Sequence, residues 1–175
     1  MWSKILNVLL VAAVLLLVYN MFIKTPDIEH GEKAPAIETE LIDGSSFSID
    51  QLKGSYVLVD FWASWCGPCI KDSPKIVGLF NKFHDKTFKD ANNFEVVSVA
   101  LEKTEGRWQK MAERFGFTWD YQIVDVVKFV RLSALANAYD VTDIPTKFLI
   151  NPDGNIISVD LPAEDIERFL TNRLQ

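Results

Sequence analysis

The hydrophobic residues form one long uncharged block near the N-terminus and several shorter blocks further along the chain. The long block, residues 5–23, reads ILNVLLVAAVLLLVYNMFI and contains no charged side chain. A helix needs about 20 apolar residues to cross the hydrocarbon core of a bilayer. The block therefore predicts a transmembrane helix that is preceded by a short tail, residues 1–4.

A cleaved signal peptide is the alternative interpretation of this block. Its apolar core would usually span about 7–15 residues and end in small residues at the cleavage site. The block here is longer and ends VYNMFIK, which favours an anchor that stays attached. Lys4 precedes it and Lys24 and Lys33 come after it, so the lysine count does not set the orientation. We expect residues 1–4 in the cytoplasm and the rest of the chain after the block on the extracytoplasmic (periplasmic) side, because short N-terminal anchors commonly export the domain attached to them.

The chain after the block divides into a tether and a folded domain. Residues 24–33 mix charges with Gly and Pro and predict the tether, and residues 34–175 form the domain. The Asp43-Gly44 pair between two short alternating stretches indicates a hairpin. Residues 56–62, YVLVDFW, are an almost continuous apolar run that is typical of a strand buried on both faces.

A helix is predicted from residue 66 to about 83, because Ile70, Val77, Phe80 and Phe83 recur at helical spacing. Strands and helices then alternate to the C-terminus. The strands are expected at 95–101, 119–124, 147–150 and 155–161, and the helices at 104–115, 131–139 and 162–172. This alternation predicts an α/β fold with a central mixed sheet flanked by helices.

The composition is that of a globular domain, and it argues against binding of nucleic acid or metal. The 175 residues are 49% hydrophobic and 24% charged, which suits a globular domain. The net charge is −6 and no stripe of Lys and Arg could follow a phosphate backbone, which argues against nucleic acid as a partner. The two Cys and two His fit no zinc-finger spacing, so we expect no metal.

The two cysteines carry the candidate chemistry, in Trp65-Cys66-Gly67-Pro68-Cys69 between a strand and a helix. The N–H groups and partial positive charge of a helix N-terminus stabilise a thiolate. Cys66 is therefore predicted to attack, and Cys69, one turn further in, to resolve the mixed disulfide. Pro68 suits the first helical turn. A structural disulfide is the alternative, but closing a loop of about four residues stabilises by only ~2 kcal/mol. No cofactor beyond this redox pair is expected.

Two acidic residues are further candidates. Asp60 interrupts the apolar run 56–62; burial would raise its pKa, and a protonatable group behind the thiols could relay protons. The alternative is an Asp at a strand end that reaches water. Asp72 lies three residues after Cys69, and a solvated acid in the first turns of the helix is its simpler interpretation.

Ile144-Pro145-Thr146 precedes a strand that should be central. A trans proline is awkward there, so a cis peptide bond is one solution, although the residues alone favour an ordinary turn proline. Trp65 is a candidate for an apolar docking rim beside the thiols.

The stretch VLVDFWASWCGPC resembles thioredoxin. GEKAP (31–35), the Asp43-Gly44 hairpin, LKG (52–54) and IPTKFLINPDG (144–154) extend the resemblance to the TlpA/ResA-like family of membrane-anchored extracytoplasmic thioredoxins. The resemblance covers about residues 34–175. It implies a thioredoxin-like fold with an N-terminal hairpin and an inserted α/β element near 102–125.

The resemblance also implies roles for individual residues. Pro145 is expected to be cis and to lie against the thiols, with the Ile144 backbone pairing with the substrate chain, and Trp65, Gly67 and Pro68 are expected to complete the substrate-binding surface. Asp60 matches the buried acid of thioredoxins, and Asp72 matches an acid found after the second cysteine in many TlpA/ResA-like proteins. In thioredoxin a Lys on the next strand faces the buried acid. Val99-Ala100-Leu101 offers none, so Asp60 is expected to be poorly compensated.

These features together predict a thiol–disulfide oxidoreductase that reduces or exchanges disulfides of extracytoplasmic proteins. Its expected partners are such proteins, an apocytochrome c among them, and a transmembrane thiol donor. One competing function is a non-catalytic thioredoxin-fold binding module. Another is a peroxide-reducing redoxin, which needs a P-x3-T-x2-C setting that this chain lacks.

Overall fold

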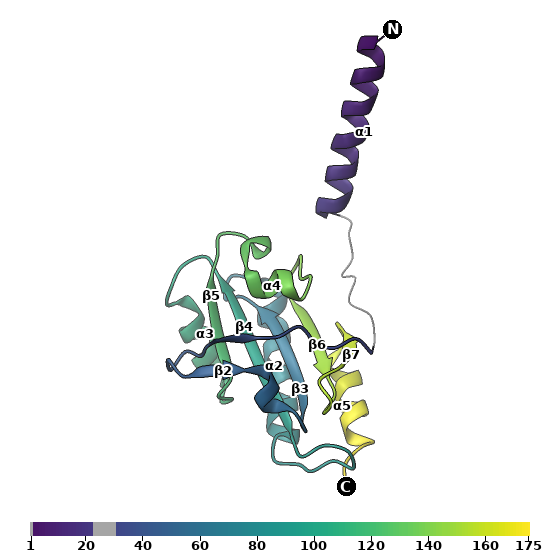
Figure 1. The fold of residues 1–175 in the computed structure, drawn as a ribbon. Coiled ribbons are helices and arrows are strands. Elements are labelled where there is room, and N and C mark those ends of the chain that lie inside the picture. Colours follow the sequence, from purple (N-terminus) through teal and green to yellow (C-terminus); the bar gives the residue numbers. More distant parts are fainter. Residues whose placement is uncertain (1, 23–30) are drawn as a thin grey trace.

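A computed structural model describes residues 2–22 and 31–175 (Figure 1). Residues 2–22 form helix α1 (Trp2–Phe22), and an α/β domain begins at residue 31. The last residue of the predicted anchor and most of the predicted tether, residues 23–30, lie outside the described residues. Within the described ranges, no helix meets the length and apolarity needed to cross a membrane.

The domain is built on a five-stranded sheet in the order β5-β4-β3-β6-β7. Strands β3, β4 and β5 are parallel to one another, whereas β6 pairs antiparallel with both β3 and β7, which confirms the predicted mixed sheet. The strands span β3 (Tyr56–Trp62), β4 (Phe94–Glu102), β5 (Gln122–Val126), β6 (Thr146–Ile150) and β7 (Ile156–Val159). All seven residues of β3 are buried, because β3 is the middle strand and both of its faces are covered.

The predicted hairpin is present as a separate two-stranded sheet of β1 (Glu38–Glu40) and β2 (Ser46–Ser48). At its turn the Asp43 carboxylate accepts hydrogen bonds from the Ser45 backbone N–H and hydroxyl group. Gly44 has a φ of 84°, a conformation that glycine adopts without strain. A short 3₁₀ helix, η1 (Ile49–Leu52), then leads into the central sheet.

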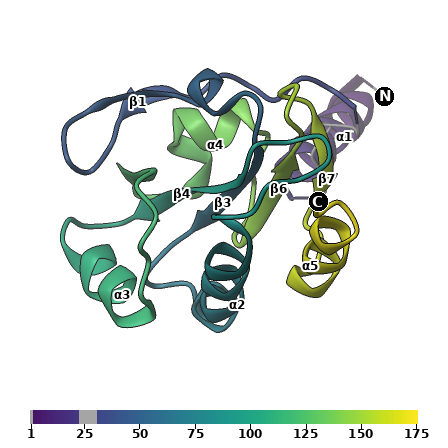
Figure 2. The same ribbon diagram turned by 90° about the horizontal axis from the view of Figure 1, so that it is seen from below.

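Helices cover both faces of the sheet (Figures 1 and 2). The turned view shows α2, α3 and α5 on one side of the strands, and α4 with the β1 region on the other. The bounds are α2 (Gly67–Phe83), α3 (Arg107–Phe115), η2 (Val130–Leu132), α4 (Ala134–Ala138) and α5 (Ala163–Thr171). Helix α3 and the edge strand β5 occupy the segment where an inserted α/β element was expected.

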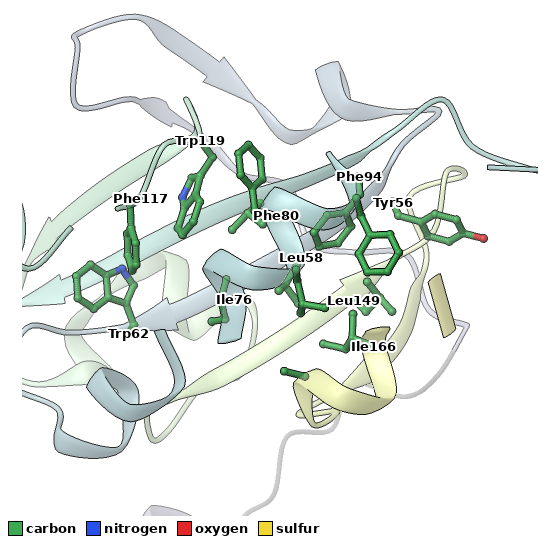
Figure 3. Close-up of a cluster of buried hydrophobic side chains, with 14 of the residues drawn as sticks. Tyr56, Leu58, Trp62, Ile76, Phe80, Phe94, Phe117, Trp119, Leu149 and Ile166 are labelled. Carbon is green, nitrogen blue, oxygen red and sulfur yellow. The ribbon is translucent and has the colours of Figure 1, made fainter. Parts of the chain in front are cut away.

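The core is arranged by the two-residue alternation of β3. Leu58 and Trp62 face the layer of α2 and α5, where they join an aromatic cluster (Figure 3), whereas Val57, Val59 and Phe61 face α4. On α2 the prediction was partly wrong. Ile70 and Val77 are only partly buried, and the side chains buried beside Phe80 and Phe83 are Cys69, Ser73, Ile76 and Leu79. Apolar spacing alone does not fix which side of a helix faces the sheet, and the buried stripe is shifted by one residue.

Candidate functional site

The two cysteines lie where β3 ends and α2 begins, and they form a disulfide with Cα atoms 5.3 Å apart. Cys66 is the N-cap residue of α2, and its Sγ accepts a hydrogen bond from the Cys69 backbone N–H at 3.2 Å. Gly67 and Pro68 form the exposed first turn. A proline is tolerated there because it has no backbone N–H, and an N–H in the first turn would have no acceptor within the helix. The same helix terminus favours a negative charge on Cys66 once the disulfide is reduced.

The two sulfurs are largely shielded from water. Cys66 is 5% exposed and Cys69 is 2% exposed, so the two residues differ little in burial. Cys66 is the N-cap residue of α2 and Cys69 lies inside the first turn, and the order of attack by Cys66 and resolution by Cys69 stays a prediction.

The Ile144-Pro145 bond is cis, as the family resemblance implied and against the turn proline favoured by the residues alone. The carbonyl oxygen of Ile144 lies 3.6 Å from Cys66 Sγ. Pairing of β6 with β3 brings this loop there, because Thr146 is the register partner of Phe61, next to the last residue of β3. Two segments almost 80 residues apart in the chain thus meet at the sulfur of Cys66.

Asp60 lies in the middle of β3 and is 2% exposed, so it does not reach water at a strand end. Because side chains alternate between the two faces of a strand, Asp60 lies on the same face as Leu58 and Trp62, which is the face covered by α2. Within the described part of the chain its Oδ1 has no hydrogen-bond partner. Burial raises the pKa of Asp60 to about 7; the charge of Lys147 counteracts this rise, and the charges of Asp72 and Asp160 add to it.

β4 offers Asp60 no lysine, as expected, but β6 does. Because the pKa of Asp60 still rises to about 7, its charge is poorly compensated, as the sequence predicted. Lys147 is the register partner of Asp60 on β6, the neighbour of β3 on the side opposite β4. Its Nζ lies 2.6 Å from Asp72 Oδ2, and its side chain is only 9% exposed. Asp72 is therefore not a solvated acid but one partner of a largely buried ion pair. Lys147 begins the apolar run KFLI, and a lysine in such a run is the sequence signal that could have revealed this ion pair.

Glu102 is a further residue of the site that the sequence did not reveal. It ends β4 with 1% exposure, and its two carboxylate oxygens accept the backbone N–H of Ser64 at 2.6 Å and the hydroxyl of Ser64 at 2.8 Å. The indole of Trp65 donates to the Leu101 carbonyl at 3.0 Å. The end of β4 therefore holds the loop that presents Cys66.

A metal centre has no candidate in the parts of the chain that the structure describes, because no three His, Cys, Asp or Glu side chains there are placed to share an ion. The site consists instead of a disulfide, a cis-proline loop and a buried acid with an ion pair beside it. Such an arrangement can exchange disulfides and can hold a proton behind the pair.

Comparisons with known proteins agree with this chemistry. Residues 54–156 match a family described as thioredoxin-like. The chain is 30% identical over 173 residues to the thiol-disulfide oxidoreductase ResA of Geobacillus kaustophilus, an alignment that covers 97% of this chain and 92% of that protein. It is 29% identical over 143 residues to ResA of Bacillus subtilis, covering 81% and 73%.

Solved structures show the same similarity. The thioredoxin domain of a thiol-disulfide oxidoreductase from Bacteroides vulgatus superposes with a TM-score of 0.69 at 29% identity, covering 82% of this chain and 99% of that one. A thiol:disulfide interchange protein from Bacteroides sp. gives a TM-score of 0.67 at 28% identity, covering 82% and 91%.

The pKa of Asp60 predicts how stability depends on pH. Because the folded value, about 7, lies above the unfolded value of 3.8, the folded state binds the proton more tightly, and Asp60 lowers the free energy of unfolding progressively as the pH rises between these values. We expect Asp60→Asn to raise the free energy of unfolding by a few kcal/mol near pH 8 and by much less near pH 4. Urea unfolding at both pH values measures this, with the exposed Asp153→Asn as the control. A gain that is equal at both pH values would contradict the buried titration.

Glu102 gives a second prediction, on the stability of the loop before Cys66. Removing its carboxylate in Glu102→Ala leaves two buried donors of Ser64 without an acceptor, so the free energy of unfolding should fall by about 2–3 kcal/mol. Glu105→Ala, an exposed neighbour, should change it by less than about 0.5 kcal/mol. Equal effects of the two substitutions in thermal or urea unfolding would show that Ser64 is not held in this way.

Proposed function

Because the chain belongs to the thioredoxin-like family and to the ResA-type thiol–disulfide oxidoreductases within it, we propose that it reduces or exchanges disulfides of extracytoplasmic proteins through Cys66 and Cys69. The observation that carries the proposal is the Cys66–Cys69 disulfide at the N-terminus of α2, against the cis Ile144-Pro145 bond. A structural disulfide of this kind would close a loop too short to stabilise the fold much.

The reaction begins with the reduced pair. The Cys66 thiolate attacks one sulfur of the substrate disulfide; that S–S bond breaks, the first substrate sulfur leaves and takes up a proton, and a mixed disulfide with Cys66 forms. The Cys69 thiolate then attacks Cys66 Sγ, and the second substrate sulfur leaves as a thiol. Two electrons have passed from the dithiol to the substrate, and the Cys66–Cys69 disulfide remains.

Asp60 is proposed to take the proton that Cys69 must lose before it attacks. A carboxyl with a pKa of about 7 can accept and return a proton near neutral pH. The Lys147–Asp72 ion pair is a positioning element, because its charges act on Asp60 in opposite directions. Asp72 is therefore assigned to this network rather than to direct contact with substrate.

The substrate chain is proposed to lie across the exposed rim of the site. Trp65, Gly67 and Pro68 form the exposed part on the helix side, and Ile144 and Pro145 form the facing loop. We propose that the Ile144 backbone pairs with the extended substrate backbone, as the family resemblance implies. An apocytochrome c is one candidate among such substrates.

We also propose that the protein is anchored in a membrane by residues 5–23 with its domain on the extracytoplasmic side. Support comes from the sequence: this segment carries no charge and has about the length that a helix needs to cross the hydrocarbon core of a bilayer. A reductant in an oxidising compartment must be reduced again, which calls for a transmembrane thiol donor.

An insulin-reduction assay with dithiothreitol separates this function from a non-catalytic binding module. We expect the full-length protein in nonionic detergent to accelerate insulin precipitation and the Cys66→Ser variant to have no effect beyond the uncatalysed rate. An inactive wild-type protein that is folded and fully reduced would favour the binding module.

The redox potential is predicted to be that of a reductant. Gly67-Pro68 is the dipeptide of thioredoxin, for which the potential is roughly −270 mV, and no cationic side chain lies between the cysteines to stabilise the thiolate further. Equilibration of the full-length protein in glutathione or dithiothreitol buffers should give a midpoint near that value. A midpoint more positive than about −180 mV, the potential of protein disulfide isomerase, would indicate disulfide formation instead.

The location predicts the outcome of protease treatment. Protease added to intact spheroplasts should digest the domain, and the undigested protein should sediment with membranes and retain residues 1–23. A cytoplasmic protein of known location is the control for intact cells. Protection of the domain, or a mature protein that lacks residues 1–23, would contradict the proposed location.

A further inference from the structure

An open cleft of about 570 Å³ includes the residue before Cys66 in its lining, and apart from Trp65 the proposed exchange mechanism does not use it. Trp65, the residue before Cys66, forms one side. The segment between β5 and α4 forms the other, with Phe129 and Leu132 as its apolar residues. Thr142, close to the cis-proline loop, also lines it. Its lining thus includes a residue next to Cys66 and a residue three positions before Pro145.

The apolar side chains of this cleft are unusually exposed. Phe129 is 62% exposed and Leu132 is 65% exposed, although each could bury a large apolar area. Outside α1, the large hydrophobic residues that the structure describes as exposed are Ile42, Trp65, Val126, Phe129 and Leu132. Three of these five line one cleft, and such a concentration marks an interaction site more often than scattered exposure does.

The charge of the cleft is opposite to that of the chain. The chain carries a net charge of −6, yet the cleft is lined by Lys103, Lys128 and Arg131 and by no carboxylate. The Lys103 ammonium group lies 4.3 Å from the centre of the Trp65 ring, and that of Lys128 lies 5.6 Å from the centre of the Phe129 ring. The cations therefore border the apolar surface directly, and a carboxylate bound there would meet them at short range.

We propose that this cleft selects the substrate: it docks the polypeptide segment next to the target cysteine when that segment presents an apolar side chain flanked by Asp or Glu. The inference rests on the proposed function and adds a substrate class to it. The apolar side chain would cover Phe129 and Leu132, and the carboxylates would face Lys103 and Lys128. Placed in this way, the neighbouring cysteine would lie between Trp65 and the cis-proline loop, at Cys66.

The transient binding that catalysis requires favours a substrate segment over a second copy of this chain, whose net charge of −6 would also complement the cleft. Complementary charges at the rim of an interface raise the rate of encounter and select among partners more than they raise affinity. A disulfide-exchange enzyme releases its product, so selection through the rate of encounter suits its reaction. The effect must weaken with added salt, because exposed charges are screened beyond about 8–10 Å at physiological ionic strength.

The test uses peptides of equal length, each holding one cysteine in a mixed disulfide with thionitrobenzoate. In the first peptide a Leu is flanked by two Glu, in the second by two Gln, and in the third the Glu are kept and Leu becomes Ser. Reduced full-length protein in nonionic detergent gives two electrons to each mixed disulfide and releases coloured thionitrobenzoate. The readout is the ratio of second-order rate constants between peptides, so any change in the general reactivity of Cys66 cancels.

We expect the Glu–Leu peptide to react about tenfold faster than the Gln–Leu peptide at low salt, and this ratio to fall in about 0.5 M salt. In the Lys103→Gln/Lys128→Gln variant the ratio should fall at least threefold. The Lys86→Gln/Lys89→Gln variant is the matched control. Both of its sites are exposed and lie beyond the far end of α2, about 25 Å along the helix from Cys66. In Phe129→Ser/Leu132→Ser the preference for Leu over Ser should be lost.

Two kinetic outcomes would overturn the proposal: equal rates for the Glu and Gln peptides with the wild-type protein, or equal ratios in the Lys103/Lys128 and Lys86/Lys89 variants. A detergent-corrected sedimentation experiment that shows a dimer dissolved by Phe129→Ser/Leu132→Ser would assign the cleft to a second copy and also overturn it. Exchange with uncharged 2-hydroxyethyl disulfide tests the proposed function separately. If the wild-type protein reduces this small disulfide but does not distinguish the peptides, only the docking inference fails.

Discussion

The burial of β3 on all seven of its residues is the constraint on which the rest of this structure depends. A strand covered on both faces and paired on both sides has one register, and its C-terminal end is therefore a fixed point. Three separate segments meet at that point: the N-terminus of α2 with Cys66, the cis Ile144-Pro145 loop before β6, and the end of β4 with Glu102. The reactive sulfur is held by sheet pairing rather than by the loop that carries it.

The same burial means that an ionised Asp60 lowers the free energy of unfolding, and this destabilisation is linked to the proposed proton exchange. A carboxyl in the middle of β3 is removed from water, so its pKa rises to about 7 and the fold is less stable above that pH. Lys147 on β6 offsets part of this cost, and Lys147 itself forms an ion pair with Asp72. A group that destabilises the resting fold in this way is well suited to exchange a proton near neutral pH, which is the role proposed for it beside Cys69.

Local patterns in the sequence predicted the helices and strands but not the side-chain contacts between different elements. The bounds of β3, the hairpin at Asp43-Gly44 and the Cys66–Cys69 pair were predictable from apolar runs, turn residues and spacing, all of which are short-range signals. The cis bond at Pro145 needed the family resemblance. Lys147 and Glu102 were missed, because their partners are set by strand order and by a contact 38 residues away, neither of which can be read from a single stretch of sequence.

The central claim is that Cys66 is the sulfur that meets the substrate and that Cys69 releases it. The most direct measurement traps the covalent intermediate with a disulfide-containing protein such as insulin and locates the adduct by mass spectrometry. Without its resolving thiol, the Cys69→Ala variant should accumulate a one-to-one mixed disulfide on Cys66, whereas Cys66→Ala should accumulate little, because Cys69 lies inside the helix and lacks the N-cap position that stabilises the Cys66 thiolate. Equal or greater adduct on Cys69 in the Cys66→Ala variant, or no adduct in either reduced and folded variant, would contradict the account.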